Sequence, residues 1–155
     1  FQQIREKYPQ INLVIKETIT EEVLHELKNN RLDCGIVVTP LNDVSIKEIV
    51  EKQTGATYNA CLLNLYHAGD EGMSWHRDNE KEIVPESSIA SVSFGAARKF
   101  AFKHAVTAQK IELMLDAGSV LDMRGPIQQH WYHALPPSKK IKDLRVNLTF
   151  RLLIK

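Results

Sequence analysis

The sequence predicts a mainly β protein, α+β overall, with a double-stranded β-helix (jelly-roll) core preceded by a strand-helix-strand segment and one further helix. About eight short apolar segments, separated by Gly, Pro, Asn or Asp, follow one another from residue 58 to residue 152. That number and spacing of strands is typical of two packed antiparallel sheets. A chain of 155 residues, 43% hydrophobic and 25% charged, is long enough for one well-buried core and too short for a second full-sized domain.

The first 43 residues predict a strand, a helix and a second strand. Apolar residues alternate from Ile11 to Lys16, and Thr20 precedes two glutamates as the N-cap of a helix that ends near Asn29. Residues 34–38 form a continuously apolar run, as in a strand that is buried on both faces. The short connections favour a parallel unit.

A second helix is expected next, beginning at Asp43 or Ser45 and running through Lys52. Gly55 follows it as a helix-ending residue. Its apolar stripe would consist of Ile46, Ile49 and Val50.

The remaining chain predicts the eight strands of the jelly roll. They cover residues 58–66, 74–78, 88–94, 98–104, 110–115, 119–123, 130–135 and 144–152.

Bulk properties favour a soluble, cytoplasmic and monomeric protein. Cys34 and Cys61 lie singly within apolar runs without metal-binding spacing, so reduced, buried thiols are expected. No apolar run reaches membrane-spanning length, and the first residues lack the pattern of a signal peptide. The formal net charge of +1 lacks the strong basic bias that would by itself indicate nucleic-acid binding.

The last predicted strand carries two arginines on one face. In an extended strand Arg145, Asn147, Thr149 and Arg151 project together, and the apolar residues between them project the other way. Burying guanidinium groups is costly unless an anion meets them, and arginine binds carboxylates with two parallel hydrogen bonds. The pattern therefore predicts an anionic ligand.

A metal site is predicted upstream, where His76 and Asp78 share a strand face. A later histidine would complete the two-histidine, one-carboxylate set that binds ferrous iron and leaves coordination positions open for a chelating keto acid and dioxygen. His130 and His133 compete for this place, and on a strand they point to opposite faces, so only one of them is expected to bind the metal.

The order of these motifs, His-x-Asp, a later histidine and the strand Arg-Val-Asn-Leu-Thr-Phe-Arg, resembles the AlkB family of iron(II)- and 2-oxoglutarate-dependent dioxygenases. The resemblance covers residues 44–155 and implies a jelly-roll enzyme that uses Fe(II), 2-oxoglutarate and O2. It aligns His133 with the second metal-binding histidine, so that His76, Asp78 and His133 would be the catalytic metal ligands. It also implies that Arg151 lies near the keto-acid end of 2-oxoglutarate and that Arg145 pairs with its distal carboxylate.

The same resemblance implies further contacts to cosubstrate and substrate. Asn64, Tyr66 and Asn147 would contact 2-oxoglutarate. Glu80 would lie at the mouth of a base pocket, although a solvated acid is nearly as good an interpretation. Trp75 would stack on a flipped base or, alternatively, belong to the core.

A basic loop is the last feature of the resemblance. Lys139 and Lys140 belong to a segment similar to a loop that contacts the DNA backbone in duplex-acting members, although a solvated surface is the ordinary interpretation of such lysines. Arg98 is a weaker candidate for the same contact.

The function that the resemblance implies is oxidative dealkylation of N-alkylated nucleobases in DNA or RNA, single-stranded or flipped out, as nucleic-acid repair. One alternative is an impaired or binding-only iron and 2-oxoglutarate module, because residues 1–43 contain no segment similar to the family's nucleotide-recognition lid. Those residues instead resemble a fragment of the effector-binding domain of LysR-type regulators, so a ligand-sensing fragment is a third alternative. The predicted domains are therefore residues 1–43 and residues 44–155.

Overall fold

The computed structural model describes residues 34–38 and 44–154. The strand predicted over residues 11–16 and the helix predicted from Thr20 to Asn29 lie outside this part of the chain. The described elements are β1 (Cys34–Val38), α3 (Val44–Thr54), β2 (Ala60–Tyr66), β3 (Met73–His76), β4 (Ile89–Gly95), β5 (Arg98–His104), β6 (Lys110–Leu115), β7 (Val120–Met123), α4 (Ile127–His130), β8 (Trp131–Leu135) and β9 (Arg145–Arg151).

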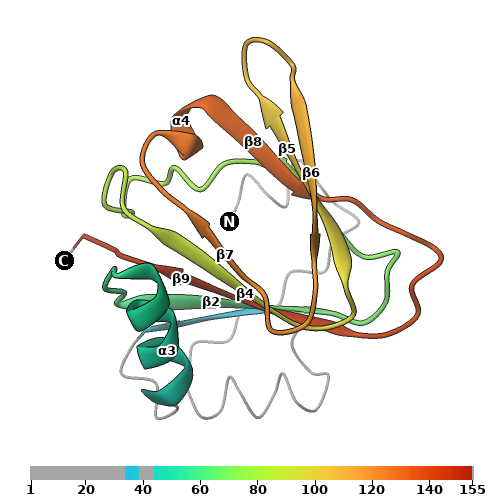
Figure 1. Cartoon of the computed structure of the whole chain (residues 1–155), viewed down its shortest axis with the longest axis horizontal. Coiled ribbons are helices and arrows are strands. Elements are labelled where there is room, and N and C mark those ends of the chain that lie inside the picture. Colours follow the sequence, from blue (N-terminus) through green and yellow to red (C-terminus); the bar gives the residue numbers. More distant parts are fainter. Residues whose placement is uncertain (1–33, 39–43, 155) are drawn as a thin grey trace, which may run out of the picture.

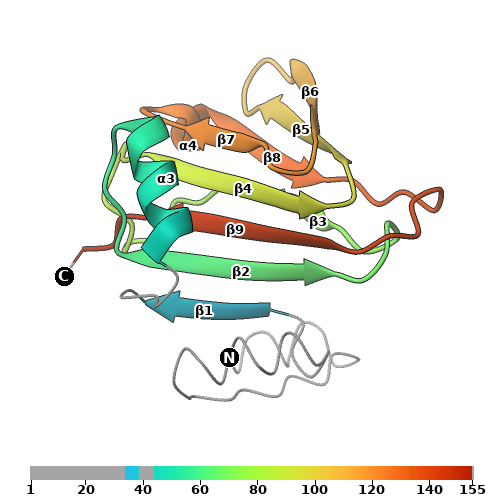
Figure 2. The ribbon, with the colours of Figure 1, turned by 60° about the horizontal axis from the view of Figure 1, so that its bottom comes forward.

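Two antiparallel sheets form the molecule, as Figures 1 and 2 show. The major sheet has the strand order β1-β2-β9-β4-β7, and the minor sheet has the order β3-β8-β5-β6. Most neighbouring strands, such as β2 and β9 or β3 and β8, are far apart in sequence, as expected for a jelly roll, so the predicted fold class is confirmed. All eight strands predicted between residues 58 and 152 are present, with small differences at their ends.

β1 belongs to the major sheet and stands at one end of its order of described strands. It pairs antiparallel with β2 from Cys34↔Asn64 to Val38↔Ala60. The strand predicted over residues 34–38 is therefore present, and it extends the same sheet that carries β9.

Helix α3 covers the outer face of the major sheet, where Figure 2 shows it across β2, β9 and β4. Val50 of α3 is buried in a cluster with Tyr58, Cys61 and Phe150. Ile46 packs against this cluster, but Ile49 is exposed, so including Ile49 in the apolar stripe was wrong. The stripe is narrower because only the residues one turn apart at i and i+4 face the sheet.

The other face of the major sheet looks toward the minor sheet. Ile83, Ile89, Phe102 and Met123 are buried in a second cluster at one end of this space. The remainder is lined by both apolar and polar side chains, and the polar ones include those of β9. The alternation predicted for β9 is therefore confirmed: Leu148 and Phe150 pack under α3, and the arginine-bearing face points between the sheets.

Two local predictions differ from the structure. Asp78 lies beyond the end of β3, and His130 ends the short helix α4, so neither is a strand residue. The four residues of α4 are too few to leave a periodic pattern. Among the described residues, no helix is both long and apolar enough to cross a membrane.

Candidate functional site

Two histidines face each other across the minor sheet. β3 and β8 pair antiparallel, with His76 directly opposite His133. Directly opposed residues of such a pair project to the same face of the sheet, and here the ring centroids are 4.3 Å apart. The ladder thus brings together two residues that are 57 positions apart in sequence.

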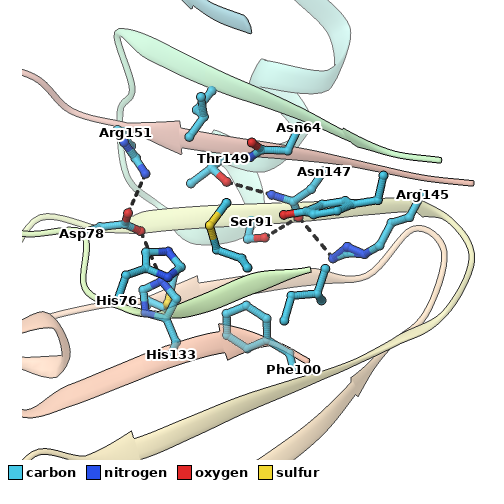
Figure 3. A pocket seen from close by; sticks show the side chains of 15 residues that line it. Asn64, His76, Asp78, Ser91, Phe100, His133, Arg145, Asn147, Thr149 and Arg151 are labelled. Atoms are coloured by element: carbon cyan, nitrogen blue, oxygen red, sulfur yellow. Dashed lines mark hydrogen bonds and ion pairs between the residues drawn. The ribbon is translucent and has the colours of Figure 1, made fainter. Parts of the chain in front are cut away.

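Asp78 approaches the same point from the turn after β3. Its backbone N–H donates a hydrogen bond to Oε1 of Gln128, 3.0 Å away on α4, which fixes this turn. The carboxylate is 4% exposed, and its Oδ2 lies 3.7 Å from Nε2 of His133. One ligand atom from each of His76, Asp78 and His133 lies within 4.8 Å of the others, so the structure brings the three predicted metal ligands together (Figure 3).

The surroundings of both imidazoles suit metal binding. Nδ1 of His76 donates to the carbonyl oxygen of Ser74 at 2.7 Å, which leaves its Nε2 with a lone pair. Burial lowers the pKa of His133 to about 3, and the nearby charges of His76 and Arg151 lower it in the same direction. Phe100 stacks on the His133 ring at 5.5 Å and keeps water from that side.

Arg151 binds the metal-site carboxylate. Its Nη2 lies 2.6 Å from Oδ1 of Asp78, and its Nη1 lies 3.8 Å from Oε1 of Glu80. One guanidinium therefore joins the candidate metal ligand to the more exposed Glu80. This ion pair leaves Oδ2 of Asp78 directed toward the histidines (Figure 3).

Arg145 lies at the other end of the pocket and is 2% exposed (Figure 3). Its Nη2 donates to Oγ of Ser93 at 2.8 Å and to Oδ1 of Asn147 at 3.2 Å. Its Nε and Nη1 are buried without a hydrogen-bond partner among the described residues. Burial lowers the pKa of this guanidinium, and no carboxylate of the described residues forms an ion pair with it.

Polar side chains occupy β9 between the two arginines. Asn147 donates to Oγ1 of Thr149 at 2.8 Å and accepts from Oγ of Ser91 at 2.7 Å. Asn64 and Tyr66 lie opposite Asn147 and Arg145 in the β2–β9 ladder. The structure therefore places all five predicted cosubstrate residues along one wall.

The predicted metal and cosubstrate residues line a single cavity between the sheets. Its lining comprises Leu62, Asn64, Tyr66, Met73, His76, Asp78, Ser91, Phe100, Met123, His133, Leu135, Arg145, Asn147, Thr149 and Arg151. Glu80 lies outside this lining and borders an adjoining cavity with Asp78. Trp75, 41% exposed, lines neither cavity.

The basic residues predicted to contact the nucleic-acid backbone differ in their exposure to solvent. Lys139 and Lys140 are exposed on the loop between β8 and β9. Arg98 is 1% exposed, so its predicted role in contacting phosphate was wrong. Its guanidinium is held by backbone carbonyls of two loops instead of by solvent.

Sequence reasoning missed the polar residues that support the site. Ser91 and Ser93 alternate on β4 and hold Asn147 and Arg145, and Gln128 holds the turn of Asp78. The two serines could have been found from the sequence, because they are two residues apart and therefore share one face of a predicted strand. No local sequence pattern indicates the role of Gln128, because its partner Asp78 lies 50 residues away.

This arrangement suits a divalent metal beside a bound carboxylate. Two imidazoles and one carboxylate leave open positions on a metal, and the unpaired donors of Arg145 need an anion at the far end of the cavity. A single molecule with a chelating end and a distal carboxylate satisfies both requirements.

Comparisons with known proteins agree with this chemistry. The family model of the 2OG-Fe(II) oxygenase superfamily matches residues 7–151. The match includes most of the segment in which a LysR-type resemblance was expected, and nothing in these comparisons supports that resemblance. The division into residues 1–43 and 44–155 remains a prediction.

Individual relatives carry AlkB-type names. The chain is 42% identical to "DNA oxidative demethylase ALKBH2" of Mus musculus, an alignment that covers 77% of this chain and 55% of the relative. It is 44% identical to the protein of that name in Homo sapiens (70% and 45% covered) and 34% identical to human "Alpha-ketoglutarate-dependent dioxygenase alkB homolog 3" (69% and 41%). The chain thus spans about half the length of these relatives.

A solved structure titled "The structure of OsALKBH1" superimposes with a TM-score of 0.60 at 18% identity, covering 77% of this chain and 78% of the other. At that identity the likeness concerns the fold, and it agrees with a jelly-roll core.

Proposed function

Because this chain belongs to the 2OG-Fe(II) oxygenase superfamily, we propose that it is a dioxygenase that removes alkyl groups oxidatively from nucleobases in DNA or RNA. The observation that carries the proposal is the combination of a His-Asp-His cluster with a buried, partly unpaired arginine at the far end of the same cavity. The AlkB-type names of the matched relatives support nucleobases as the substrate class.

His76, Asp78 and His133 would hold the iron(II) of this superfamily. When bound, iron(II) couples the decarboxylation of 2-oxoglutarate by dioxygen to hydroxylation of a C–H bond. The donor set fits this ion, since two imidazoles and a carboxylate are typical of non-haem iron oxygenases. Arg151 orients the carboxylate of Asp78, and the carbonyl of Ser74 sets the tautomer of His76.

Arg145 would bind the distal carboxylate of 2-oxoglutarate through its free Nε and Nη1. Ser93 and Asn147 hold the guanidinium in place before the ligand arrives, which lowers the entropic cost of binding. Asn64, Tyr66 and Asn147 would supply further polar contacts along the wall. A cosubstrate fixed in this way leaves the Glu80 side of the cavity for the substrate.

An alkylated base would reach this cavity only from a single strand or after flipping out of a duplex, at a cost of a few kcal/mol. Glu80, half exposed and near Arg151, is positioned to accept a hydrogen bond from an exocyclic amine or to stabilise a cationic methylated base. Trp75 would act as an exposed stacking surface outside the cavity, and Lys139 and Lys140 would meet phosphates. Hydroxylation of the N-alkyl carbon gives a hemiaminal that releases an aldehyde and the unmodified base.

Incubation with iron(II), ascorbate, 2-oxoglutarate and an N-methylated oligonucleotide tests the proposal, with succinate and base demethylation followed by mass spectrometry. His133→Ala is expected to abolish both products, because it removes a metal ligand. His130→Ala is the matched control, since His130 ends α4 outside the cluster and should leave both products unchanged.

Absence of demethylation by the unmodified chain would contradict the proposal. Succinate formed slowly, with no loss of methyl groups and no stimulation by the oligonucleotide, would instead indicate a module that binds iron and 2-oxoglutarate without productive substrate.

A further inference from the structure

The most deeply buried arginine of the described residues forms no ion pair with a carboxylate. Arg98, the first residue of β5, is 1% exposed, and no ion pair within residues 34–38 and 44–154 involves it. Burial of a guanidinium without an anion is costly, and burial lowers the pKa of this side chain. A buried polar network whose hydrogen bonds are satisfied makes the structure around it more rigid, so the partners of Arg98 show what it holds.

Arg98 donates to backbone carbonyls of two loops. Its Nη2 lies 3.0 Å from the carbonyl oxygen of Gly69 and 2.7 Å from that of Glu71, both in the loop between β2 and β3. The same Nη2 lies 3.1 Å from the carbonyl oxygen of Pro136, at the start of the loop between β8 and β9. One side chain therefore ties residues 67–72 to residues 136–144.

The two loops are also joined directly. The Gly69 N–H donates to the Ile141 carbonyl at 3.0 Å, and the Ser138 N–H donates to the Gly69 carbonyl at 2.5 Å. A Cβ on Gly69 would lie 2.3 Å from the Ser138 oxygen, so only glycine allows this approach. We call this assembly of Arg98, Gly69 and the two loops the loop clasp.

The clasp holds the basic segment of the chain. Lys139, Lys140 and Lys142 lie on the 136–144 loop, are exposed, and form no ion pair within the described part of the chain. The loop runs from Leu135 to Arg145, both of which line the cavity. Fixing its backbone therefore sets the distance between three free positive charges and the candidate metal site.

We propose that Arg98 is a positioning residue: through the loop clasp it holds Lys139, Lys140 and Lys142 where they bind the phosphate backbone of the nucleic acid whose base enters the cavity. The inference rests on the proposed function for its substrate class. Tyr66 and Arg145 are held by the β2–β9 ladder, so loss of Arg98 releases the loops first and leaves the cavity wall paired.

The test is a double-mutant cycle on oligonucleotide binding, measured by fluorescence anisotropy at several salt concentrations with the full chain. Arg98→Met and the combined Lys139→Ala, Lys140→Ala, Lys142→Ala variant should each weaken binding several-fold and lower the magnitude of the salt slope, by about two to three for the triple variant. A variant that carries both sets of changes should bind almost as well as the triple-lysine variant alone, because both sets remove the same phosphate contacts. Lys52→Met, which removes one exposed positive charge from α3, should leave affinity and slope unchanged.

Two further variants keep the outcome informative if Arg98→Met folds poorly. Gly69→Ala leaves Arg98 in place but forces the loops apart, and it should reproduce the weakened binding and the same lack of additivity. Arg98→Lys keeps the charge but cannot reach all the carbonyls, so it should restore part of the affinity. In both Arg98→Met and Gly69→Ala, hydrogen exchange at the amides of Gly69, Ser138 and Ile141 should accelerate.

A full additional loss of affinity when Arg98→Met is placed in the triple-lysine background would overturn the inference, as would unchanged exchange at the clasp amides. Lack of binding by the unmodified chain would also overturn it. Lysine-dependent binding and a non-additive cycle without base demethylation would instead leave the clasp standing and contradict the proposed dealkylase activity alone.

Discussion

At the residue scale, Asp78 is held by contacts to three other residues of the site. Its Oδ2 faces His133, its Oδ1 binds Arg151, and its N–H is held by Gln128. A carboxylate with so many constraints has little freedom to rotate, which favours a metal site that is formed before the metal binds. Arg151 then links this ligand to Glu80 and hence to the side of the cavity proposed for the base.

Arg145 gives a prediction about cosubstrate affinity. Arg145→Lys keeps a positive charge but loses the planar fork, so the KM for 2-oxoglutarate should rise about 10- to 100-fold, the size expected for charge-assisted hydrogen bonds. Succinate formation against 2-oxoglutarate concentration measures it. Arg77→Lys is the matched control, because Arg77 lies over the Tyr132 ring and does not line the cavity. An unchanged KM in Arg145→Lys would contradict the assigned role.

His133 gives a prediction about pH. Burial, His76 and Arg151 hold its pKa at about 3, whereas an unfolded histidine has a pKa near 6.5, so the unfolded state binds more protons between these values. The free energy of unfolding of the metal-free protein should therefore be highest, as far as His133 contributes, above about pH 6.5. It should fall progressively as the pH drops toward 3, by on the order of a few kcal/mol. Urea unfolding in EDTA at several pH values measures it, and His133→Asn should give a flatter profile.

At the element scale, helix α3 is attached to the sheet by a chain of hydroxyl groups. The Tyr58 hydroxyl lies 2.9 Å from Oγ1 of Thr54 and 2.7 Å from Oγ of Ser88, which donates to Asp122. Arg124 donates hydrogen bonds both to Asp122 and to the carbonyl oxygen of Thr54 at the end of α3, and so closes the network. The network fixes the helix above β2, β9 and β4.

Tyr58→Phe removes the central hydroxyl and leaves two partly buried partners without it. We expect a loss of about 1–3 kcal/mol in the free energy of unfolding, measured by urea titration. Tyr132→Phe is the matched control, since the Tyr132 ring contacts Arg77 through its face, and that contact survives the change. Equal stability losses in the two variants would contradict a special role for the network.

Sequence reasoning succeeded for elements with strong local patterns and failed where long-range contacts decide. The alternation in residues 145–151 identified both the strand and its buried polar face, because period two leaves no other arrangement of these side chains. The burial of Arg98 depends on carbonyls of residues 69, 71 and 136, and no local pattern encodes them. The helix α4 and its Gln128 contact were missed for the same reason.

At the scale of the whole molecule, the candidate metal ligands join separate parts of the fold. His76 ends β3, Asp78 lies in the following turn, and His133 lies on β8. An ion that binds all three in the native state and not in the unfolded chain stabilises the entire structure by mass action.

Metal addition should therefore raise the melting temperature. At Mn²⁺ or Fe²⁺ concentrations about 100 times the Kd, the stabilisation is about 2.7 kcal/mol, which corresponds to about 5–10 °C for a protein of this size. Anaerobic thermal unfolding measures the shift. Asp78→Ala should lose it, and His130→Ala should retain it. A shift of equal size in Asp78→Ala would indicate that the metal binds elsewhere.

The pairing of His76 with His133 also makes the metal a reporter of correct assembly. If β3 slipped by one residue against β8, every side chain of β3 would exchange faces, and His76 would point away from His133. Such a mispaired chain would fold into a similar outline yet fail to chelate the ion. Loading with iron during biosynthesis would consequently favour chains whose strands have found their proper alignment, and metal-starved cells should accumulate more of the misaligned form.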